Sequence, residues 1–174
     1  FDGTVEQVGA SFGVRKWVPT GWGWEPIDVA LPRTERSTGD GHKDFEVQFN
    51  PTLPIQADLA RRDFTVNAMA VSVDDPEVII DPRGGQKDLG NRVLRMVHED
   101  IFQEDPLRIL RGAQLGTRLG LTPSLETQWA MGQAVSLLPS VSPERVSGEL
   151  AKLMTATRPS YGWALLRFIG ALEP

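Results

Sequence analysis

The chain has 174 residues, of which 40% are hydrophobic and 24% are charged, and its formal net charge is −5. This length suits one large domain or two small ones, and the negative charge argues against a protein that holds nucleic acid through a general positive field. The chain has no cysteine, which excludes disulfides and thiolate metal sites. It has no apolar run of about 18 residues, so we expect no membrane span, and the cytoplasm is the expected compartment.

The first third of the chain is typical of β structure. Residues 12–18 and 24–31 are rich in aromatic and β-branched residues, and the turn sequence PTGWG lies between them, so they predict a hairpin. Residues 33–46 are polar and contain glycine without periodicity, which predicts a mobile surface loop.

The middle of the chain predicts short elements of mixed type. We expect a helix over 58–64, strands within 67–73 and 78–80, a glycine-led helix or turn over 84–92, and a strand over 93–97. Together with the first third, these elements predict an α+β domain in which a mixed sheet is accompanied by helices.

The last third of the chain predicts helices alone. Asp105 is a suitable N-cap and Pro106 fits the first helical position, with apolar residues at helical spacing after them. Three further helices are expected over about 124–138, from Ser142, and after Pro159. The change in character near residues 98–104 predicts two domains, over 1–98 and 99–174.

The segment QEDPLRILR, residues 103–111, places Asp105 three residues before Arg108. At helical spacing the two side chains share a face, so a carboxylate acceptor stands beside a guanidinium donor. The Watson–Crick edges of cytosine and adenine present an amino donor beside a ring-nitrogen acceptor, whereas uracil and guanine present the reverse order. Such a pair could therefore accept C and A and reject U and G. The alternative interpretation is a helix cap with an ordinary helical salt bridge.

Several segments in a fixed order resemble a known family. They are VGASFGV (8–14), IDVALPRTERSTG (27–39), DLARRDFTVNAMA (58–70), IIDPRGGQKDLGNRVLRMV (79–97), EDPLRILRGAQLGTRLGL (104–121) and PERVSGELAKLM (143–154). Together they resemble the class II tRNA nucleotidyltransferases, the CCA-adding enzymes, and the related bacterial poly(A) polymerases. The resemblance covers nearly the whole chain. It implies a polymerase-β-like nucleotidyltransferase head followed by an all-helical neck.

The resemblance also implies an activity, which is template-independent addition of CMP and AMP to the 3′ end of tRNA. CTP and ATP would be the substrates, and the protein itself would select the base. In the family the acid and base of the ED-x-x-R motif face the incoming nucleotide, and they correspond to Asp105 and Arg108. Arg111 on the same helix is also expected to contact the nucleotide. No protein partner is expected.

The RRD motif of the family corresponds to Arg61, Arg62 and Asp63, and the resemblance places it around the sugar and the phosphates. Two planar guanidiniums suit a triphosphate, because each can bind phosphate oxygens in a bidentate manner. A carboxylate suits a ribose hydroxyl, and Asn67 is close enough in sequence to help. The alternative is that the two arginines point to opposite sides of a helix and are solvated.

Two further sites follow from the resemblance. Asp28 corresponds to the third carboxylate beside a catalytic pair, which implies a catalytic role and a share in binding Mg²⁺. The alternative is an outward-facing strand residue. Arg145 and Glu149, at i,i+4, correspond to the last motif of the family, and we expect them to form an ion pair that braces the nucleotide-reading helix.

The sequence departs from the family pattern at one place. The D-x-D motif that supplies the two principal metal ligands is absent from this chain. We therefore expect the parent protein to transfer nucleotides and the 174-residue chain itself to be inactive, with weak binding of CTP or ATP. Three interpretations remain open: a CCA-adding enzyme, a relative that makes poly(A) or adds only C or only A, and a non-catalytic protein that binds nucleotide or RNA.

Overall fold

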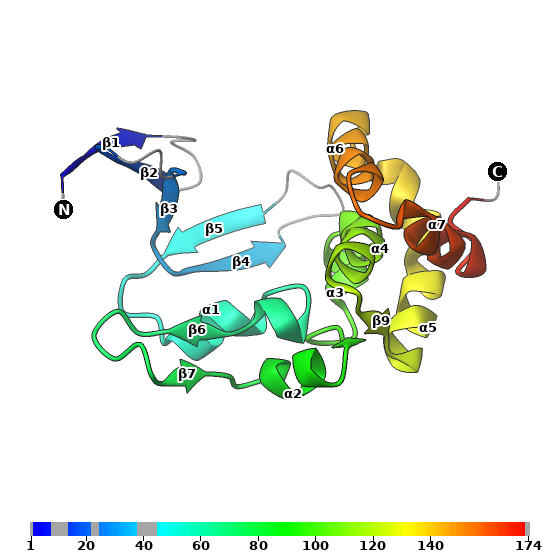
Figure 1. Cartoon of the computed structure of the whole chain (residues 1–174), viewed down its shortest axis with the longest axis horizontal. Coiled ribbons are helices and arrows are strands. Elements are labelled where there is room, and N and C mark those ends of the chain that lie inside the picture. The colour runs from blue at the N-terminus through cyan, green and yellow to red at the C-terminus, as the bar shows by residue number, and fades with distance from the viewer. Residues whose placement is uncertain (1, 8–13, 22–24, 38–44, 173–174) are drawn as a thin grey trace. The chain divides into compact units, whose positions relative to one another are not determined.

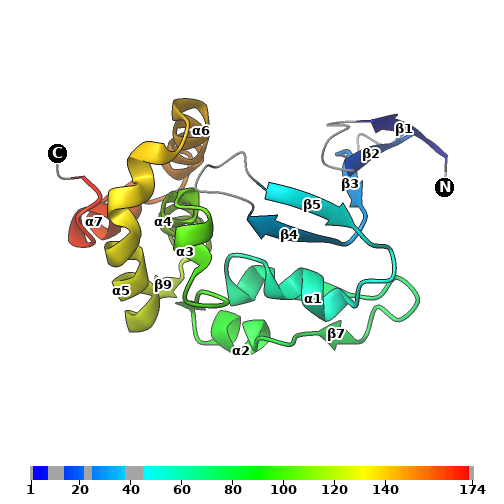
Figure 2. The same cartoon turned by 180° about the vertical axis from the view of Figure 1, so that it is seen from behind.

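The computed structural model describes residues 2–7, 14–21, 25–37 and 45–172. The chain divides into two compact units, Phe1–Asp58 and Leu59–Pro174. Figures 1 and 2 show the elements of each unit from opposite sides. The predicted domains over 1–98 and 99–174 stay a prediction.

The first unit contains two small antiparallel sheets. The three-stranded sheet has the order β1 (Gly3–Gln7), β2 (Val14–Pro19) and β3 (Ile27–Ala30). The two-stranded sheet pairs β4 (Arg33–Ser37) with β5 (Phe45–Phe49). Within the first sheet, Trp17 of β2 lies opposite Val5 on one side and Ile27 on the other. The predicted pairing of the two segments in 12–18 and 24–31 is confirmed for their described residues.

The predicted loop over 33–46 is wrong at both ends, because residues 33–37 belong to β4 and residues 45–46 to β5, and its middle, 38–44, lies outside the described residues. Residues 33–37 form β4, which pairs in register from Arg33 opposite Phe49 to Ser37 opposite Phe45. The sequence RTERS has no alternation of apolar and polar residues, and this alternation is the signal that marks a half-buried strand. A strand in a two-stranded ribbon does not need that pattern, so the sequence pattern did not reveal it.

Short elements fill the segment that follows. They are α1 (Ile55–Ala60), the 3₁₀ helix η2 (Thr65–Asn67), β6 (Ala70–Val71), β7 (Ile79–Ile80), α2 (Gly85–Gly90) and β8 (Val93–Leu94). β6 pairs antiparallel with β7, as the two predicted strands suggest. The helix predicted over 58–64 lies earlier, at Ile55–Ala60. It cannot continue to residue 64, because Phe64 is extended (φ −126°, ψ 150°) and fully buried.

The remaining chain is helical except for β9 (Thr122–Pro123), which pairs in parallel with β8. The helices are α3 (Ile101–Glu104), α4 (Leu107–Leu119), α5 (Leu125–Ala134), the 3₁₀ helix η3 (Val135–Ser140), α6 (Pro143–Met154) and α7 (Pro159–Phe168). Gly120 follows α4 in the left-handed conformation at φ 64°, a common end of a helix. None of the described helices has the length and apolar character that a membrane span requires.

The core of the second unit is built around α4. Figures 1 and 2 show α6 and α7 beside α4, and both helices pack against it. The buried face of α4 includes Ile109 and Ala113, and the rings of Phe64 and Phe102 lie close by, with centroids 6.3 Å apart. Because Phe64 comes from the segment before the helices, this core fixes that segment against α4.

A matched pair of glycines tests this packing. A Cβ at Gly112 of α4 would meet the Met131 side chain and the Phe64 ring, whereas a Cβ at Gly148 of α6 would meet nothing within 4 Å. We expect Gly112→Ala to lower the free energy of unfolding by roughly 1–3 kcal/mol. We expect Gly148→Ala to raise it by up to about 1 kcal/mol, since alanine is the better helix former. Urea unfolding of both variants measures the difference, and equal effects would contradict the packing described.

Candidate functional site

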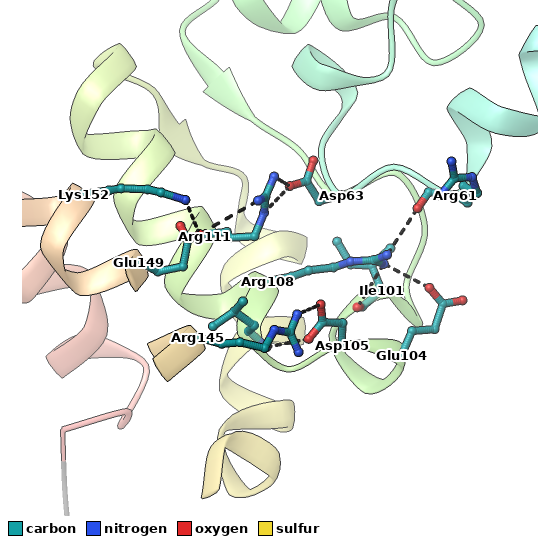
Figure 3. A network of polar contacts seen from close by, with 11 residues as sticks. Arg61, Asp63, Ile101, Glu104, Asp105, Arg108, Arg111, Arg145, Glu149 and Lys152 are labelled. Carbon is teal, nitrogen blue, oxygen red and sulfur yellow. Dashed lines mark hydrogen bonds and ion pairs between the residues drawn. The ribbon is translucent and has the colours of Figure 1, made fainter. Parts of the chain in front are cut away.

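Asp105 lies at the junction between α3 and α4. Its backbone is extended (φ −147°, ψ 98°), and its Oδ1 accepts a hydrogen bond from the N–H of Leu107 at 3.2 Å. The carbonyl of Asp105 accepts from the N–H of Arg108 at 3.0 Å. Asp105 therefore satisfies an N–H of the first turn, as predicted, but α4 begins at Leu107 and Pro106 occupies the N-cap position, one residue later than the prediction. The second carboxylate oxygen, Oδ2, accepts a hydrogen bond from Nη2 of Arg145 on α6 at 2.7 Å (Figure 3).

Arg108 has different partners from Asp105. Its Nη1 donates to the carbonyl of Ile101 at 3.2 Å and to Oε2 of Glu104 at 3.0 Å. Its Nη2 donates to the carbonyl of Arg61 at 3.3 Å (Figure 3). Asp105 and Arg108 therefore do not form the ordinary helical salt bridge considered as the alternative. Each member of the pair is held by other parts of the second unit.

These anchors leave hydrogen-bonding capacity on both side chains. A guanidinium has five N–H groups, and the contacts of Arg108 use both hydrogens of Nη1 and one of Nη2. The Nε–H and one Nη2–H have no acceptor among the described residues. A carboxylate has about four acceptor positions, and the contacts of Asp105 use two of them. The arrangement is a fixed acceptor and a fixed donor, each able to bind a further group.

Asp63 lies at the centre of a second group of contacts. Its side chain is 7% exposed. Oδ1 accepts from the N–H of Phe64 at 2.8 Å and from Nδ2 of Asn67 at 3.1 Å. Oδ2 accepts from Nε of Arg111 at 2.8 Å and lies 2.8 Å from Nη2 of the same residue. The structure thus brings together Asp63, Asn67 and Arg111 from the set predicted from the sequence.

The two arginines of the RRD motif lie in different environments. Arg61 is half-buried and Arg62 is exposed. The only part of Arg61 that Figure 3 joins to the group is its carbonyl, which accepts from Arg108. The predicted role of the two guanidiniums in binding phosphate stays a prediction.

The predicted ion pair between Arg145 and Glu149 is wrong. Arg145 binds Asp105, whereas Glu149, which is 5% exposed, accepts from Nζ of Lys152 at 2.8 Å and lies 4.0 Å from Nη1 of Arg111 (Figure 3). Arg145 is in the first turn of α6 and reaches the α3–α4 junction, while Glu149 faces α4 one turn later. Both residues still join α6 to the segment that carries Asp105 and Arg108.

Sequence reasoning missed two residues of these networks, Glu104 and Lys152. Each stands at helical spacing from its partner, Glu104 four residues before Arg108 and Lys152 three residues after Glu149. The spacing was a usable signal in both cases. It did not show which of several acidic and basic neighbours pair.

The DPRGG segment, residues 81–85, forms the turn into α2. Oδ1 of Asp81 accepts from the N–H of Gly85 at 2.7 Å, and Oδ2 accepts from the N–H of Gln86 at 2.9 Å. Gly84 is left-handed at φ 73°, a conformation that suits glycine. Desolvation alone would raise the pKa of Asp81, but the N–H groups of Gln86 and Gly85 together outweigh it and hold the pKa below its ordinary value of 3.8.

The lowered pKa of Asp81 gives a pH-dependent prediction. A carboxyl with a depressed pKa in the folded state contributes stability above its unfolded pKa and loses it as the pH falls through the folded value. We therefore expect wild type to be more stable than Asp81→Asn at pH 6, with the gap shrinking progressively as the pH falls toward and below 3.8. Urea unfolding of both proteins from pH 6 to pH 3 measures this. A gap that is constant over the range would contradict the prediction.

Asp28 lies on β3, in the first unit. Its side chain is 65% exposed, and Oδ1 is 3.9 Å from Nζ of Lys16. In the part of the chain that the structure describes, no group of three or more histidine, aspartate or glutamate side chains is placed to hold a metal ion. The described residues therefore do not make up a complete metal site, and the role of Asp28 stays a prediction.

Two protein families match the sequence. Residues 2–95 match the family described as the poly A polymerase head domain. Residues 120–174 match the family described as the probable RNA and SrmB-binding site of polymerase A. The first match alone covers more than half of the chain.

Curated relatives include two multifunctional CCA proteins. That of Vibrio parahaemolyticus is 44% identical over 148 residues, which are 82% of this chain and 36% of the relative. That of Xylella fastidiosa strain M12 is 42% identical over 151 residues, which are 84% of this chain and 36% of the relative. The chain thus spans about a third of the length of these relatives.

Solved structures that resemble this chain are also CCA-adding enzymes. The CCA-adding enzyme of Bacillus stearothermophilus in complex with CTP superposes with a TM-score of 0.81 and 29% identity over 97% of this chain and 39% of the other. The CCA-adding enzyme of Thermotoga maritima in complex with tRNA superposes with a TM-score of 0.75 and 29% identity, over 97% of this chain and 37% of the other. The predicted fold class is therefore confirmed.

Proposed function

Because the chain belongs to the family of the poly A polymerase head domain, we propose that the whole protein is a cytoplasmic nucleotidyltransferase that adds CMP and AMP to the 3′ end of tRNA. CTP and ATP are the proposed substrates. The 44% identity to a multifunctional CCA protein favours CCA addition over poly(A) synthesis. The anchored Asp105 and Arg108, held apart from one another at the start of α4, are the observation that carries the proposal.

The proposed base selection uses the hydrogen-bonding groups of Asp105 and Arg108 that their anchoring contacts do not occupy. The carboxylate of Asp105 accepts from the amino group of cytosine or adenine, and the free N–H groups of Arg108 donate to the adjacent ring nitrogen. Uracil or guanine would set a carbonyl oxygen against the carboxylate and an N–H against the guanidinium. Each unsatisfied polar group would cost roughly 1–3 kcal/mol. Since the anchors come from several elements, the pair does not rearrange to suit the wrong base.

We assign the sugar and triphosphate to the segment around Asp63. The guanidiniums of Arg61 and Arg62 are proposed to bind phosphate oxygens. The carboxylate of Asp63 is proposed to face a ribose hydroxyl, with Asn67 and Arg111 fixing its position. Two hydrogen bonds to the Asp63 carboxylate support this assignment. Asn67 donates to Oδ1 and Arg111 donates to Oδ2, so both oxygens are oriented.

A divalent cation, which we propose to be Mg²⁺, would activate the attacking 3′-hydroxyl and stabilise the leaving pyrophosphate when bound. Asp28 is the residue of this chain that we assign to it. The D-x-D motif of the family is absent from this sequence, so we expect the 174-residue chain by itself to be inactive. The other ligands would come from the rest of the whole protein.

The proposed function is tested with the full-length protein and a tRNA that lacks its CCA end. We expect two CMP residues to be added from CTP alone, and one AMP after them when ATP is also present. Long tails from ATP alone would identify a poly(A) polymerase, and addition of only C or only A would identify a partial-end enzyme. Nucleotide or RNA binding without any incorporation would instead indicate a non-catalytic protein.

A further inference from the structure

A groove lies between α3 and α5, and neither Asp105 nor Arg108 is among its lining residues. Its volume is about 690 Å³. Met96 and Ala130 are its more buried lining residues, and the indole of Trp129 on α5 is 69% exposed. Its other lining residues are two glutamines and three carboxylates, which are Glu99, Asp100 and Glu126. All of these residues belong to the second compact unit.

The groove is acidic. None of its lining residues is lysine or arginine. Arg95 lies 3.6 Å from Glu126, but it is also bonded to Asp88. Hydrogen bonds from its own backbone N–H and from the Ser124 hydroxyl keep the pKa of Glu126 below its ordinary value, so it is ionised at neutral pH. Within the described part of the chain, Glu99 and Asp100 face the groove with no cationic partner.

This combination suits a cationic ligand. An exposed tryptophan face attracts a guanidinium or an ammonium through the quadrupole of its ring. Carboxylates on the rim attract further cations, whereas they repel phosphate groups. An RNA strand could stack a base on Trp129, but its phosphates would then lie beside three negative charges. Charge complementarity therefore favours protein over RNA.

We propose that this groove binds a basic segment of a partner protein, with an arginine or lysine side chain over the indole of Trp129 and neighbouring cations beside the three carboxylates. The sequence did not lead us to expect a protein partner. The site is distinct from the proposed nucleotide site, although α3 borders both: Asp100 at its start lines the groove, and Glu104 at its end holds Arg108.

The test uses the full-length protein and a fluorescein-labelled peptide of alternating arginine and glycine, with fluorescence anisotropy as the readout. A peptide with glutamate in place of arginine and a labelled single-stranded RNA of equal length are the comparison ligands. Trp129→Ala removes the aromatic face. The triple variant E99Q/D100N/E126Q removes the rim charges. D74N/D75N/E77Q removes the same number of charges from an exposed loop of the same unit and is the matched control.

We expect the arginine peptide to bind, with Kd raised about fivefold by Trp129→Ala and about tenfold by the rim triple. The control triple should stay within about twofold of wild type, because distant exposed charges are largely screened. Equal weakening by both triples would show that net charge alone attracts the peptide and would overturn the proposal. Absence of peptide binding, or RNA binding that depends on Trp129, would overturn it as well. None of these results depends on nucleotide addition, so the proposed function is tested separately.

Discussion

The variant Arg108→Ala of the full-length enzyme is expected to lose most of its discrimination between CTP and UTP. The Arg108 side chain is 15% exposed and its guanidinium is held by the carbonyls of Ile101 and Arg61, so the remaining N–H groups point in fixed directions. Losing a donor matched to the ring nitrogen should lower selectivity by roughly 1–3 kcal/mol, which is about fivefold to more than a hundredfold. The measurement is the ratio of kcat/KM for the two nucleotides on tRNA that lacks its end.

Two further variants make this result interpretable. Arg108→Lys keeps the charge but not the planar fork, and it should also lose selectivity. Lys152→Ala removes a cation from α6 that binds Glu149 and not the reading pair, and its selectivity should equal that of wild type. The assignment of Arg108 to base selection is wrong if Arg108→Ala keeps its selectivity and weakens the binding of all triphosphates equally.

The largest effect on stability is expected for Asp63→Ala. The Asp63 side chain is 7% exposed and receives donors from Phe64, Asn67 and Arg111. Removing it leaves these donors without their acceptor. A fully buried pair would lose 3–5 kcal/mol, but Arg111 is 38% exposed, so we expect the free energy of unfolding to fall by about 2–3 kcal/mol.

The matched control is Asp74→Ala, an exposed aspartate of the same unit. It should change the free energy of unfolding by less than about 0.5 kcal/mol. Urea unfolding of the two variants beside wild type gives the comparison. If Asp63→Ala is as stable as Asp74→Ala, the contacts around Asp63 do not stabilise the protein, and its burial has another cause.

The helices were predictable from the sequence because their signals are local. Asp105 and Pro106 mark the start of α4, Ser124 caps α5 through the N–H of Thr127 at 3.3 Å, and prolines begin α6 and α7. The strand at Arg33–Ser37 lacked such a signal, because its pairing partner lies beyond a polar segment. Local pattern therefore located elements in the second unit better than in the first.

The candidate site was predictable in its residues but not in its pairings. The motif around Asp105 and Arg108 pointed to both residues, yet their partners come from α6, from α3 and from residue 61. Which acid meets which base depends on how helices cross, and sequence spacing does not encode that. The i,i+4 spacing of Arg145 and Glu149 therefore led to a wrong pairing. In the fold Arg145 binds Asp105, and Glu149 binds Lys152.

The most direct test of the account is a structure of the full-length protein with CTP bound. We expect the cytosine amino group about 3 Å from a carboxylate oxygen of Asp105 and the ring nitrogen N3 at a similar distance from an N–H of Arg108. Arg145 and Glu104 should keep their contacts with the pair. A cytosine that lies elsewhere, with neither residue within hydrogen-bond distance of its Watson–Crick edge, would contradict base selection by this pair.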